Sequence, residues 1–397
     1  MRILIAHEAA AGGGGVESYL AAVIPALAER GHAVALLHQR SLRQDGPTRL
    51  QFDGVPQFSV EDHGVDTSLQ QLAAWQPDIC FSHNMGALDV DAALVARWPT
   101  IKMMHGFFGT CISSQKAHAF PSVVPCSRVF GPPCVAFYVP RRCGPLRPGK
   151  AAASLRWNLR QRGMFDGYAA IVVASRHMRD EYIRHGVAAD RVITAPLFPT
   201  TQNHEGVRFP PVEPTVLFAG RMTALKGPRV LLEAVAAAGK LLGGTPRLVM
   251  AGDGPERAGL IAMAKALGIP ASFPGWVTGS RLADAFQGAS VIAIPSLWPE
   301  PFGLVGLEAG VHGVPAIAFD SGGISEWLQD GVNGHLVRER GDAAALGAAL
   351  ASVLGNPESM RALGAGALAA ASRMTLGNHV QRLEAAFVSA VTSVATA

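Results

Sequence analysis

The sequence predicts an α/β protein made of two domains, each built on a parallel β-sheet. Short apolar segments rich in β-branched residues alternate with segments long enough for helices, which is typical of parallel strands joined by crossover helices. A chain of 397 residues that is 49% hydrophobic can bury two separate cores. A polar segment with four prolines at residues 198–214 is typical of a linker between domains.

The predicted strands form one series on each side of this linker. We therefore expect domains at residues 1–205 and 206–375. The final segment, 376–397, has apolar residues at helical spacing and predicts a terminal helix. The predicted strands are residues 2–6, 33–38, 78–82, 100–104 and 170–174 in the first series, and 215–219, 247–251, 290–295 and 314–319 in the second.

The segment at residues 298–310 carries two glutamates in a setting suited to sugar and phosphate. Glu300 lies in a loop bounded by prolines, and Glu308 lies two turns into a helix that we expect to start near residue 303. The first N–H groups of such a helix have no partner within it and can bind an anion. Carboxylates bind sugar and ribose hydroxyls, so the segment predicts a sugar-nucleotide site. A capped, solvated helix is the alternative.

This glutamate pair resembles the E-x7-E signature of retaining, nucleotide-sugar-dependent glycosyltransferases of the GT-B fold, the group 1 or family 4 class. Residues 218–227 resemble the family's Gly-Arg-x4-Lys-Gly diphosphate clamp, and residues 250–255 resemble its Gly-x-Gly-Pro strand end. Residues 321–326 and the pair Asn333-Gly334 match its later turns. The first half is similar more loosely, through the glycines at 12–15 and through His105-Gly106.

The resemblance implies a fold and a set of donor-binding residues. It implies two Rossmann-like domains that face across a cleft, with the acceptor on the first domain, the nucleotide sugar on the second, and the last helix crossing back to the first. Glu300 would orient the donor sugar and Glu308 would hold the ribose. The residues expected to bind a UDP-sugar or GDP-sugar are Gly14, Gly15, Gly220, Arg221, Lys226, Gly252, Val277, Glu300, Phe302, Gly303, Leu304, Val305 and Glu308.

Arg221 and Lys226 are expected to bind and stabilise the departing diphosphate. They lie five residues apart, between a strand and the helix that Pro228 begins, so both can reach one helix start. Two cations together with helix N–H groups can neutralise a diphosphate without a divalent metal. We therefore expect no cofactor for catalysis.

The glycine-rich turn at residues 12–15 follows the first strand and lets a backbone approach a ligand at a helix N-terminus. A dinucleotide-binding turn would have a third glycine where Glu17 stands, and a carboxylate at the end of the second strand, which ends at Arg40. The pattern therefore disfavours NAD. The resemblance implies that this turn faces the acceptor and the transferred sugar, and a turn that is merely tight is the alternative.

His105 follows a predicted strand at the carboxyl edge, where open α/β sheets bind ligands. A single histidine at a strand end is more often structural. The resemblance implies that His105 lines the donor-sugar pocket and helps to position the sugar, so we count it with Glu300, Arg221 and Lys226 as catalytic. His7 and His83 also end strands and are the alternative candidates.

The net charge of +4 is unevenly distributed along the chain. Residues 92–165 contain eleven Lys and Arg but no Asp or Glu, whereas the rest of the chain has 23 basic and 30 acidic residues. With Phe137, Tyr138 and Trp157 interleaved, this stretch predicts contact with an anionic membrane or an anionic acceptor. A solvated basic loop is the alternative, and nucleic acid is disfavoured because no binding motif accompanies the charge.

The sequence also indicates where the protein acts. No segment approaches the roughly 18 apolar residues of a membrane span. Residues 1–7 predict a first strand rather than a signal peptide. We expect a cytoplasmic protein, with peripheral contact at the inner face of the cell membrane.

Four of the five cysteines lie in the basic stretch, and Cys80 lies in a predicted core strand. Disulfides are disfavoured in the cytosol, where clustered cysteines more often serve metal or redox chemistry. Their spacing lacks the tight pairs of common zinc sites, so a structural zinc and free thiols both stay open. The four candidate ligands are Cys111, Cys126, Cys134 and Cys143.

The sequence thus predicts a retaining glycosyltransferase that moves a sugar from a nucleotide-sugar donor to a glycan or lipid-linked acceptor, in polysaccharide or glycoconjugate biosynthesis. Retention of configuration is implied by the resemblance alone. A sugar-nucleotide epimerase of the same fold is one alternative. A catalytically silent, sugar-nucleotide-binding subunit is another, although a silent paralogue often loses one of the residues named above.

Overall fold

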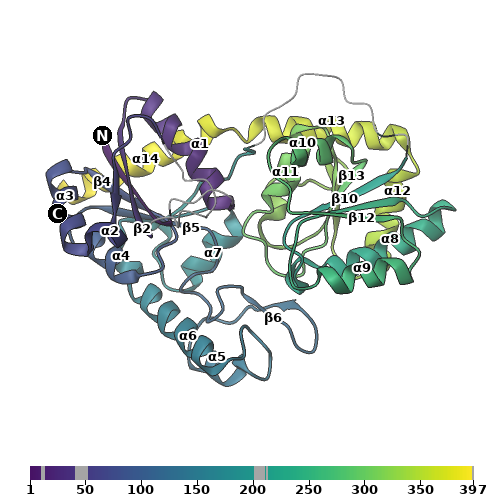
Figure 1. The fold of residues 1–397 in the computed structure, drawn as a ribbon, viewed down its shortest axis with the longest axis horizontal. Helices are drawn as coiled ribbons and strands as arrows, with labels where there is room; N and C mark the ends of the chain where they lie inside the picture. Colours follow the sequence, from purple (N-terminus) through teal and green to yellow (C-terminus); the bar gives the residue numbers. More distant parts are fainter. Residues whose placement is uncertain (10–13, 41–51, 201–210, 212, 396–397) are drawn as a thin grey trace.

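The computed structural model describes residues 1–9, 14–40, 52–200, 211 and 213–395, which form two α/β domains side by side (Figure 1). Each domain is built on one large sheet in which all strand pairs are parallel. The predicted fold class is therefore confirmed. The predicted boundary between residues 205 and 206 lies outside the described residues.

The sheet of the N-terminal domain has seven strands in the order β3-β2-β1-β4-β5-β8-β9. The central strands are buried on both faces, as expected for a parallel sheet between two layers of helices. The strands are β1 (Arg2–Ala9), β2 (Ala33–Arg40), β3 (Gln57–Ser59), β4 (Ile79–Ser82), β5 (Thr100–Met104), β8 (Ala170–Val173) and β9 (Val192–Thr194).

The sheet of the C-terminal domain has six strands in the order β12-β11-β10-β13-β14-β15. Its middle strands, β10 and β13, are neighbours, so the loops that follow them leave the same edge of the sheet side by side. The strands are β10 (Thr215–Ala219), β11 (Arg247–Ala251), β12 (Ala271–Gly275), β13 (Val291–Ile294), β14 (Ala316–Phe319) and β15 (Gly334–Val337).

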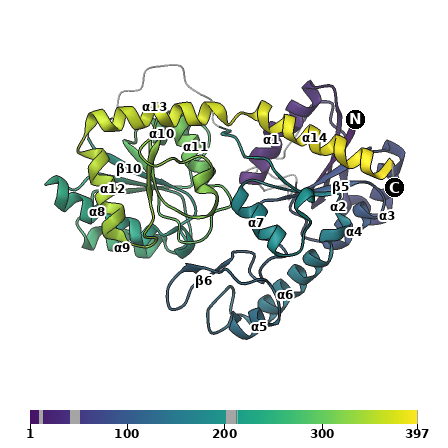
Figure 2. The ribbon, with the colours of Figure 1, turned by 180° about the vertical axis from the view of Figure 1, so that it is seen from behind.

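Helices connect the strands and cover both sheets (Figures 1 and 2). Those of the N-terminal domain are α1 (Gly15–Glu29), α2 (Val60–His63), α3 (Val65–Trp75), α4 (Leu88–Val95), α5 (Pro132–Tyr138), α6 (Pro148–Gly163) and α7 (Arg176–Arg184), with 3-10 turns η1 (Phe165–Gly167) and η2 (Ala189–Arg191). Those that follow are η3 (Ala224–Lys226), α8 (Pro228–Leu242), α9 (Arg257–Ala266), α10 (Ser280–Gln287), α11 (Leu304–Val311), η4 (Gly322–Glu326), α12 (Ala343–Leu354), α13 (Pro357–Arg373) and α14 (Leu376–Ala395).

Four strands of the two large sheets were not predicted, namely β3, β9, β12 and β15. They are the four edge strands of the two sheets, each three to five residues long. An edge strand pairs on one side only and is partly solvated, so it needs no continuous apolar run. Its pairing is supplied by the neighbouring strand, which local sequence does not reveal.

Helix α14 crosses from the C-terminal domain back to the N-terminal domain, which confirms the expectation from the resemblance (Figure 2). Val380, Leu383 and Phe387 are fully buried in the core of the N-terminal domain, where the ring of Phe387 lies 5.3 Å from that of Phe81. None of the described helices has an apolar stretch long enough to cross a bilayer.

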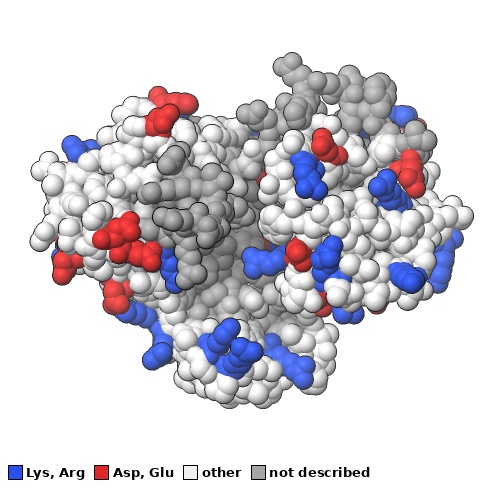
Figure 3. Space-filling view, viewed as in Figure 1, with Lys and Arg blue, Asp and Glu red and all other residues white. Residues whose placement is uncertain are grey.

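Between β5 and β8 the chain makes a long excursion, which forms a lobe beside the N-terminal sheet (Figure 1). It contains α5, α6 and a short antiparallel pair, β6 (Ala117–His118) and β7 (Val124–Pro125). Lys and Arg side chains gather on the face of this lobe seen in Figure 3. The lobe corresponds to most of the basic stretch at residues 92–165.

Candidate active site

Glu300 is held in the loop after β13 by three hydrogen bonds to one oxygen. Its side chain is nearly fully buried, and Oε1 accepts from Lys226 Nζ at 2.6 Å, from Trp298 Nε1 at 3.0 Å and from the hydroxyl of Ser296. The ammonium of Lys226 also lies 5.3 Å from the centre of the Trp298 ring. The carboxylate is therefore fixed in place through Oε1, which accepts all three hydrogen bonds.

The turn at residues 321–323 supports this loop from behind. Gly323 N donates to Glu300 O at 2.7 Å, and the Ser321 hydroxyl donates to the carbonyl of Trp298. Gly322 has φ +63°, and a side chain there would overlap the backbone of Glu300. Both glycines are therefore required by the close packing of two backbones, which gives the Ser-Gly-Gly sequence a physical reason.

The turn after β10 contains Arg221 and Lys226 and leads into α8. Gly227 precedes that helix with φ +65°, and a side chain there would overlap a carbonyl just after β13. A side chain on Gly252 would likewise overlap the carbonyl of Gly220. Lys226 is about one third exposed, and the guanidinium of Arg221 is exposed to solvent. Lys226 thus lies next to the N-terminus of α8, which favours an anionic ligand, and Arg221 belongs to the same turn after β10.

Helix α11 begins at Leu304, directly after Gly303 in the left-handed conformation at φ +76°. The N–H groups of Leu304 and Val305 belong to its first turn and have no partner within the helix. Glu308 lies further along and is largely enclosed. Burial raises its pKa to about 7, although Thr200 Oγ1 donates a hydrogen bond to Oε1 at 3.1 Å. The Glu308 carboxyl group therefore titrates near neutral pH.

Two predicted donor-binding residues lie in other surroundings. The Phe302 side chain is buried in the core, and its carbonyl accepts from Trp327 Nε1 at 2.8 Å, so its ring does not face a ligand. Val277 lines a hollow of about 380 Å³ together with Thr215 and Arg281.

On the N-terminal domain, His105 follows β5 and lies beside the two alternative candidates. His83 Nδ1 is 2.9 Å from His105 Nε2, and the rings of His7 and His83 meet edge to face at 6.4 Å. His7 Nε2 in turn lies 3.3 Å from a carboxylate oxygen of Glu17. The three histidines, treated separately in the sequence, form one cluster.

Within this cluster, His105 is uncharged at neutral pH. Burial lowers the pKa of His105 to about 3, and it also lowers the pKa of His83. A neutral imidazole can position a sugar through a hydrogen bond but cannot act as a cation. The bond to His7 lowers the pKa of Glu17, which therefore stays ionised.

Gly14 precedes α1 and Gly15 is its first residue, whereas Gly12 and Gly13 lie outside the described residues. A side chain on Gly14 would overlap the carboxylate of Glu17, which folds back over the helix start. The carboxylate therefore lies beside the start of α1.

Sequence reasoning missed four residues that hold the site together. Trp298 and Ser296 bond Glu300, and Tyr19 OH lies 2.8 Å from His379 Nε2 while His379 Nδ1 contacts a backbone carbonyl. Trp298 was visible because it stands two residues before Glu300. The pairing of Tyr19 with His379 joins positions 360 residues apart, and no local pattern signals it.

The structure corrects part of the expectation for the basic stretch. Lys102 and Lys116 are buried and paired with Asp91 and Glu181, so these two cations do not face a surface. Tyr138 is buried as well, and Trp157 lines a cavity described below. Exposed cations remain on the lobe at Arg142, Arg147, Lys150 and Arg156.

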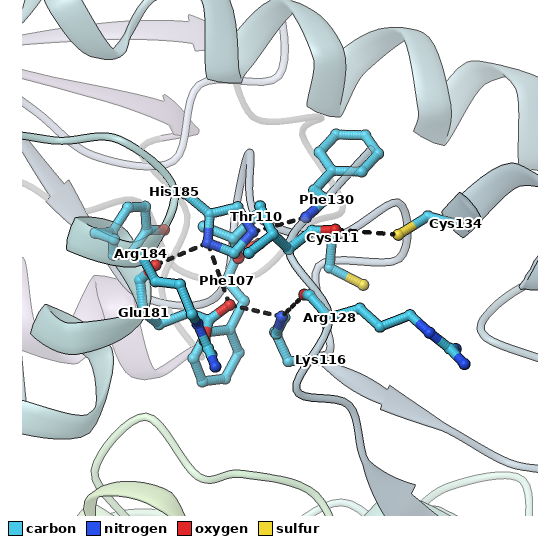
Figure 4. A network of polar contacts seen from close by, with 12 residues as sticks. Phe107, Thr110, Cys111, Lys116, Arg128, Phe130, Cys134, Glu181, Arg184 and His185 are labelled. Carbon is cyan, nitrogen blue, oxygen red and sulfur yellow. Dashed lines mark hydrogen bonds and ion pairs between the residues drawn. The ribbon is translucent and has the colours of Figure 1, made fainter. Parts of the chain in front are cut away.

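The four clustered cysteines have free thiols, and Figure 4 shows two of them, Cys111 and Cys134, beside a buried ionic network. In this network Lys116 Nζ lies 2.6 Å from Glu181 Oε1, and the backbone N–H of Phe130 donates to His185 Nε2 at 2.9 Å. These contacts tie the lobe to α7. Among the described residues, which include all four cysteines, no three His, Cys, Asp or Glu side chains are arranged to hold a metal ion. Of the zinc and the free thiols that the sequence left open, the described residues thus provide no ligand set for the zinc.

The two domains also touch through residues near the site. The ring of Phe107, two residues after His105, lies 6.3 Å from that of Trp298 at a right angle. Arg176 N, at the start of α7, donates to Glu326 at 2.6 Å. The histidine cluster and the Glu300 loop therefore belong to one region between the domains.

Two parallel-sheet domains with a cation-rich helix start, an enclosed glutamate and a returning C-terminal helix define a protein of the GT-B class. Comparison with family models agrees: residues 13–198 match the model described as Glycosyltransferase Family 4, and residues 199–369 match the model described as Glycosyl transferases group 1. The chain therefore belongs to the group 1, family 4 glycosyltransferases.

Individual relatives match over part of the chain. The D-inositol 3-phosphate glycosyltransferase of Segniliparus rotundus is 36% identical over 174 residues, which are 42% of this chain and 37% of that protein. The protein of the same name from Streptomyces griseus is 40% identical over 166 residues, 38% of this chain and 34% of that protein. The match thus spans little more than a third of these relatives' length.

Solved structures match over nearly the whole chain, and their low identity shows the fold alone. Anabaena HepE in complex with UDP and glucose has a TM-score of 0.69 and 19% identity, and the match covers 97% of this chain and 98% of HepE. Sucrose-phosphate synthase from Thermosynechococcus elongatus has a TM-score of 0.68 and 20% identity, with 96% and 97% covered.

Proposed function

We propose that this protein is a nucleotide-sugar-dependent glycosyltransferase that retains the donor's anomeric configuration. The observation that carries the proposal is the contact between Lys226 and Glu300, which puts a cation and a fixed carboxylate at one point beside the N-terminus of α8. A sugar diphosphate presents an anion and a ring of hydroxyls a few ångströms apart. Lys226 can bind the anion, and Glu300 can bind the hydroxyls.

In the proposed reaction, Lys226 leaves Glu300 and binds the diphosphate together with Arg221 and the helix N–H groups. Glu300 then accepts hydrogen bonds from the sugar hydroxyls, and Glu308 accepts from the ribose. The bond between C1 of the sugar and the phosphate oxygen breaks, and its electron pair stays on the diphosphate. The acceptor oxygen bonds to C1 and passes its proton to the phosphate oxygen that has just left C1. The two cations stabilise the charge that develops on the leaving group.

The donor is expected to be a UDP-hexose or a GDP-hexose. The structurally similar protein HepE was solved with UDP and glucose, which makes UDP-glucose the first donor to test. His105 is neutral, and Phe107, two residues later, contacts Trp298 of the Glu300 loop, so His105 suits a positioning role at the sugar. No divalent metal is required in this scheme, because the cations come from the protein.

The acceptor is proposed to be a glycan or lipid-linked molecule, reached at an anionic membrane through the lobe. Half of the sixteen exposed large hydrophobic residues of the described chain lie on this lobe. They are interspersed with the exposed cations named above, and apolar side chains next to Lys and Arg suit a bilayer surface. The eight exposed apolar residues are Phe120, Val124, Val129, Val135, Phe137, Val139, Leu146 and Leu159.

A thermal-shift screen against UDP-, GDP- and ADP-sugars tests the donor assignment, because a ligand that binds the native state raises the melting temperature. We expect one nucleotide class to raise it by several degrees in wild type and not in Arg221→Ala. Product analysis with the donor so identified then separates transfer from epimerisation. Release of an altered sugar with no glycosylated acceptor would contradict the proposal.

A further inference from the structure

A cavity of about 450 Å³ lies within the N-terminal domain, between the carboxyl ends of its central strands and helix α6. Glu8 lines it from β1, residues 83–86 from the end of β4, and Lys102 from β5. The carboxyl edge is where open α/β sheets place their ligands. His83 belongs both to the cavity wall and to the histidine cluster, through its 2.9 Å contact with His105.

Three polar atoms on residues of this wall are buried and lack a hydrogen-bond partner. They are Asn84 Oδ1, Gln161 Oε1 and His83 Nε2. His83 and Gln161 are completely buried. An unpaired polar atom in a protein interior is unfavourable, and most such atoms in folded proteins have a partner. Three of them at one cavity indicate that a ligand supplies the missing bonds.

A neighbouring amide shows that this lack of partners is specific. Asn158, one turn before Gln161 on α6, also lines the cavity, but its Oδ1 accepts from Gly109 N and Ser114 Oγ, and its Nδ2 donates to two carbonyls. Asn158 is therefore structural. Gln161 instead donates from Nε2 to Tyr168 OH at 2.9 Å, which fixes its amide with Oε1 as a free acceptor.

An aromatic wall completes the cavity. Trp157 is fixed at its edge by the bond from Nε1 to Gly86 O at 3.0 Å, and its ring meets that of Phe108 at 5.5 Å and 74°. Pockets that combine fixed aromatic surface with a few placed polar groups are typical of small-molecule sites. The apolar C–H face of a sugar ring suits such a wall.

The charges of the wall disfavour an anion. Among the described residues that line the cavity, Lys102 is the one Lys or Arg, and its Nζ lies 2.7 Å from Asp91 and 3.0 Å from the hydroxyl of Ser82. Its charge is therefore neutralised inside the protein. Glu8 adds a carboxylate, whose Oε1 lies 3.5 Å from the exposed guanidinium of Arg40, and the amide oxygens of Asn84 and Gln161 are acceptors. Hydrogen-bond acceptors and a carboxylate bind the hydroxyl donors of a ligand, whereas a phosphate is bound by cations.

We propose that this cavity binds the acceptor through an uncharged, hydroxyl-rich ring and discriminates against phosphorylated rings. The ring would pack on Trp157, and its hydroxyls would donate hydrogen bonds to Gln161 and Asn84. The assignment of this ligand as the acceptor rests on the function proposed above. The curated relatives are named for D-inositol 3-phosphate, so the chemistry of this cavity implies a different acceptor for this chain.

Saturation-transfer NMR on the full chain tests the proposal with four probes: methyl β-glucoside and myo-inositol, and their charged counterparts glucose 6-phosphate and inositol 3-phosphate. We expect saturation transfer to at least one neutral probe, and at least fivefold weaker transfer to its phosphorylated counterpart at equal concentration. Trp157→Ala and Gln161→Leu should each reduce transfer to the neutral probe at least threefold. Ala152→Ser, at an exposed position on the same helix outside the cavity wall, is the matched control and should change nothing.

No transfer to either neutral probe, equal transfer to the phosphorylated ones, or transfer unaffected by both cavity variants would overturn the proposal. Using two variants guards against a fold defect in one of them. The donor-induced thermal shift is measured in parallel on the same samples. If neutral probes bind as expected while no nucleotide sugar raises the melting temperature, the glycosyltransferase proposal fails and the cavity remains a polyol site.

Discussion

The ammonium nitrogen of Lys226 lies 2.6 Å from Oε1 of Glu300, although the two residues are 74 positions apart. Their turns follow β10 and β13, which are adjacent parallel strands and therefore end side by side. Each residue is the charge partner of the other. A sugar diphosphate would have to separate them, giving the phosphate to the lysine and the sugar to the glutamate.

The substitution Glu300→Gln is expected to lower kcat/KM by at least ~100-fold, which is about 2.7 kcal/mol of transition-state stabilisation. The amide keeps the shape of the side chain but loses the charge that strengthens bonds to sugar hydroxyls and balances Lys226. Steady-state kinetics with the identified donor measures this. Glu339→Gln, on an exposed surface position, is the control. A folded Glu300→Gln protein with more than half the wild-type rate would remove Glu300 from the mechanism.

The substitution Arg221→Ala is also expected to lower kcat/KM by at least ~100-fold. Its exposed guanidinium lies at the turn before α8, free to bind a diphosphate. The loss should include weaker donor binding, measured by calorimetry. Arg361→Ala, an exposed arginine on α13, should leave both quantities unchanged. Unaltered donor affinity and rate in Arg221→Ala would show that the diphosphate is bound elsewhere.

Transfer is expected to proceed without added divalent metal and to retain the anomeric configuration of the donor. Lys226 and Arg221 provide the positive charge that a metal would otherwise supply. Activity in EDTA checks the first part, and proton NMR of the fresh product checks the second. Complete loss of activity in EDTA that Mg²⁺ or Mn²⁺ restores would contradict the first part, and an inverted product would contradict the second.

The parts of this structure that sequence predicts are those fixed by local geometry. Gly227, Gly303 and Gly322 have positive φ angles that favour glycine, so their turns leave a recognisable spacing around Arg221 and Glu300. The central strands are equally visible, because burial on both faces requires apolar runs.

The features that sequence does not predict depend on distant partners. The edge strands take their conformation from a neighbour, and the Tyr19–His379 contact exists only because α14 returns to the first domain. The burial of Lys102 and Tyr138 likewise depends on distant partners. A charged and a polar side chain are expected at the surface, but the tertiary structure provides Asp91 for the lysine and an apolar cluster around the tyrosine.

Donor affinity is expected to fall about tenfold between pH 8 and pH 6 because of Glu308. Burial raises its pKa to about 7, so it is mostly protonated at pH 6 and mostly ionised at pH 8, and the ionised form accepts ribose hydroxyls better. Binding of a UDP-sugar near pH 7 should therefore release a fraction of a proton, since hydroxyl donors favour the carboxylate. Calorimetry in buffers of different ionisation enthalpy measures that release.

Glu308→Gln is the control for this linkage, because the amide does not titrate. It should bind donor with an affinity that is independent of pH between 6 and 8, and without proton release. His105 stays neutral over this range, since its pKa is lowered to about 3. If the wild type and Glu308→Gln show the same pH dependence, the titrating group is another residue.

The lobe at residues 106–163 is expected to bind anionic vesicles reversibly and in a salt-dependent manner. Basic residues near an anionic surface contribute about 1 kcal/mol each, and Arg142, Arg147, Lys150 and Arg156 are exposed there. The double substitution Val135→Ser with Val139→Ser removes two side chains that are 54% and 62% exposed, and should weaken sedimentation with vesicles several-fold. Rising salt should weaken it further by screening.

The matched control replaces two equally exposed apolar residues outside the lobe, Leu241→Ser on α8 and Val388→Ser on α14, which are 65% and 52% exposed. This variant should sediment with vesicles like the wild type, because both positions lie outside the lobe that is proposed to face the bilayer. Equal binding to neutral and anionic vesicles, or equal loss in both double variants, would mean that the lobe is a solvated surface. The acceptor would then have to reach the cavity beside Trp157 from solution.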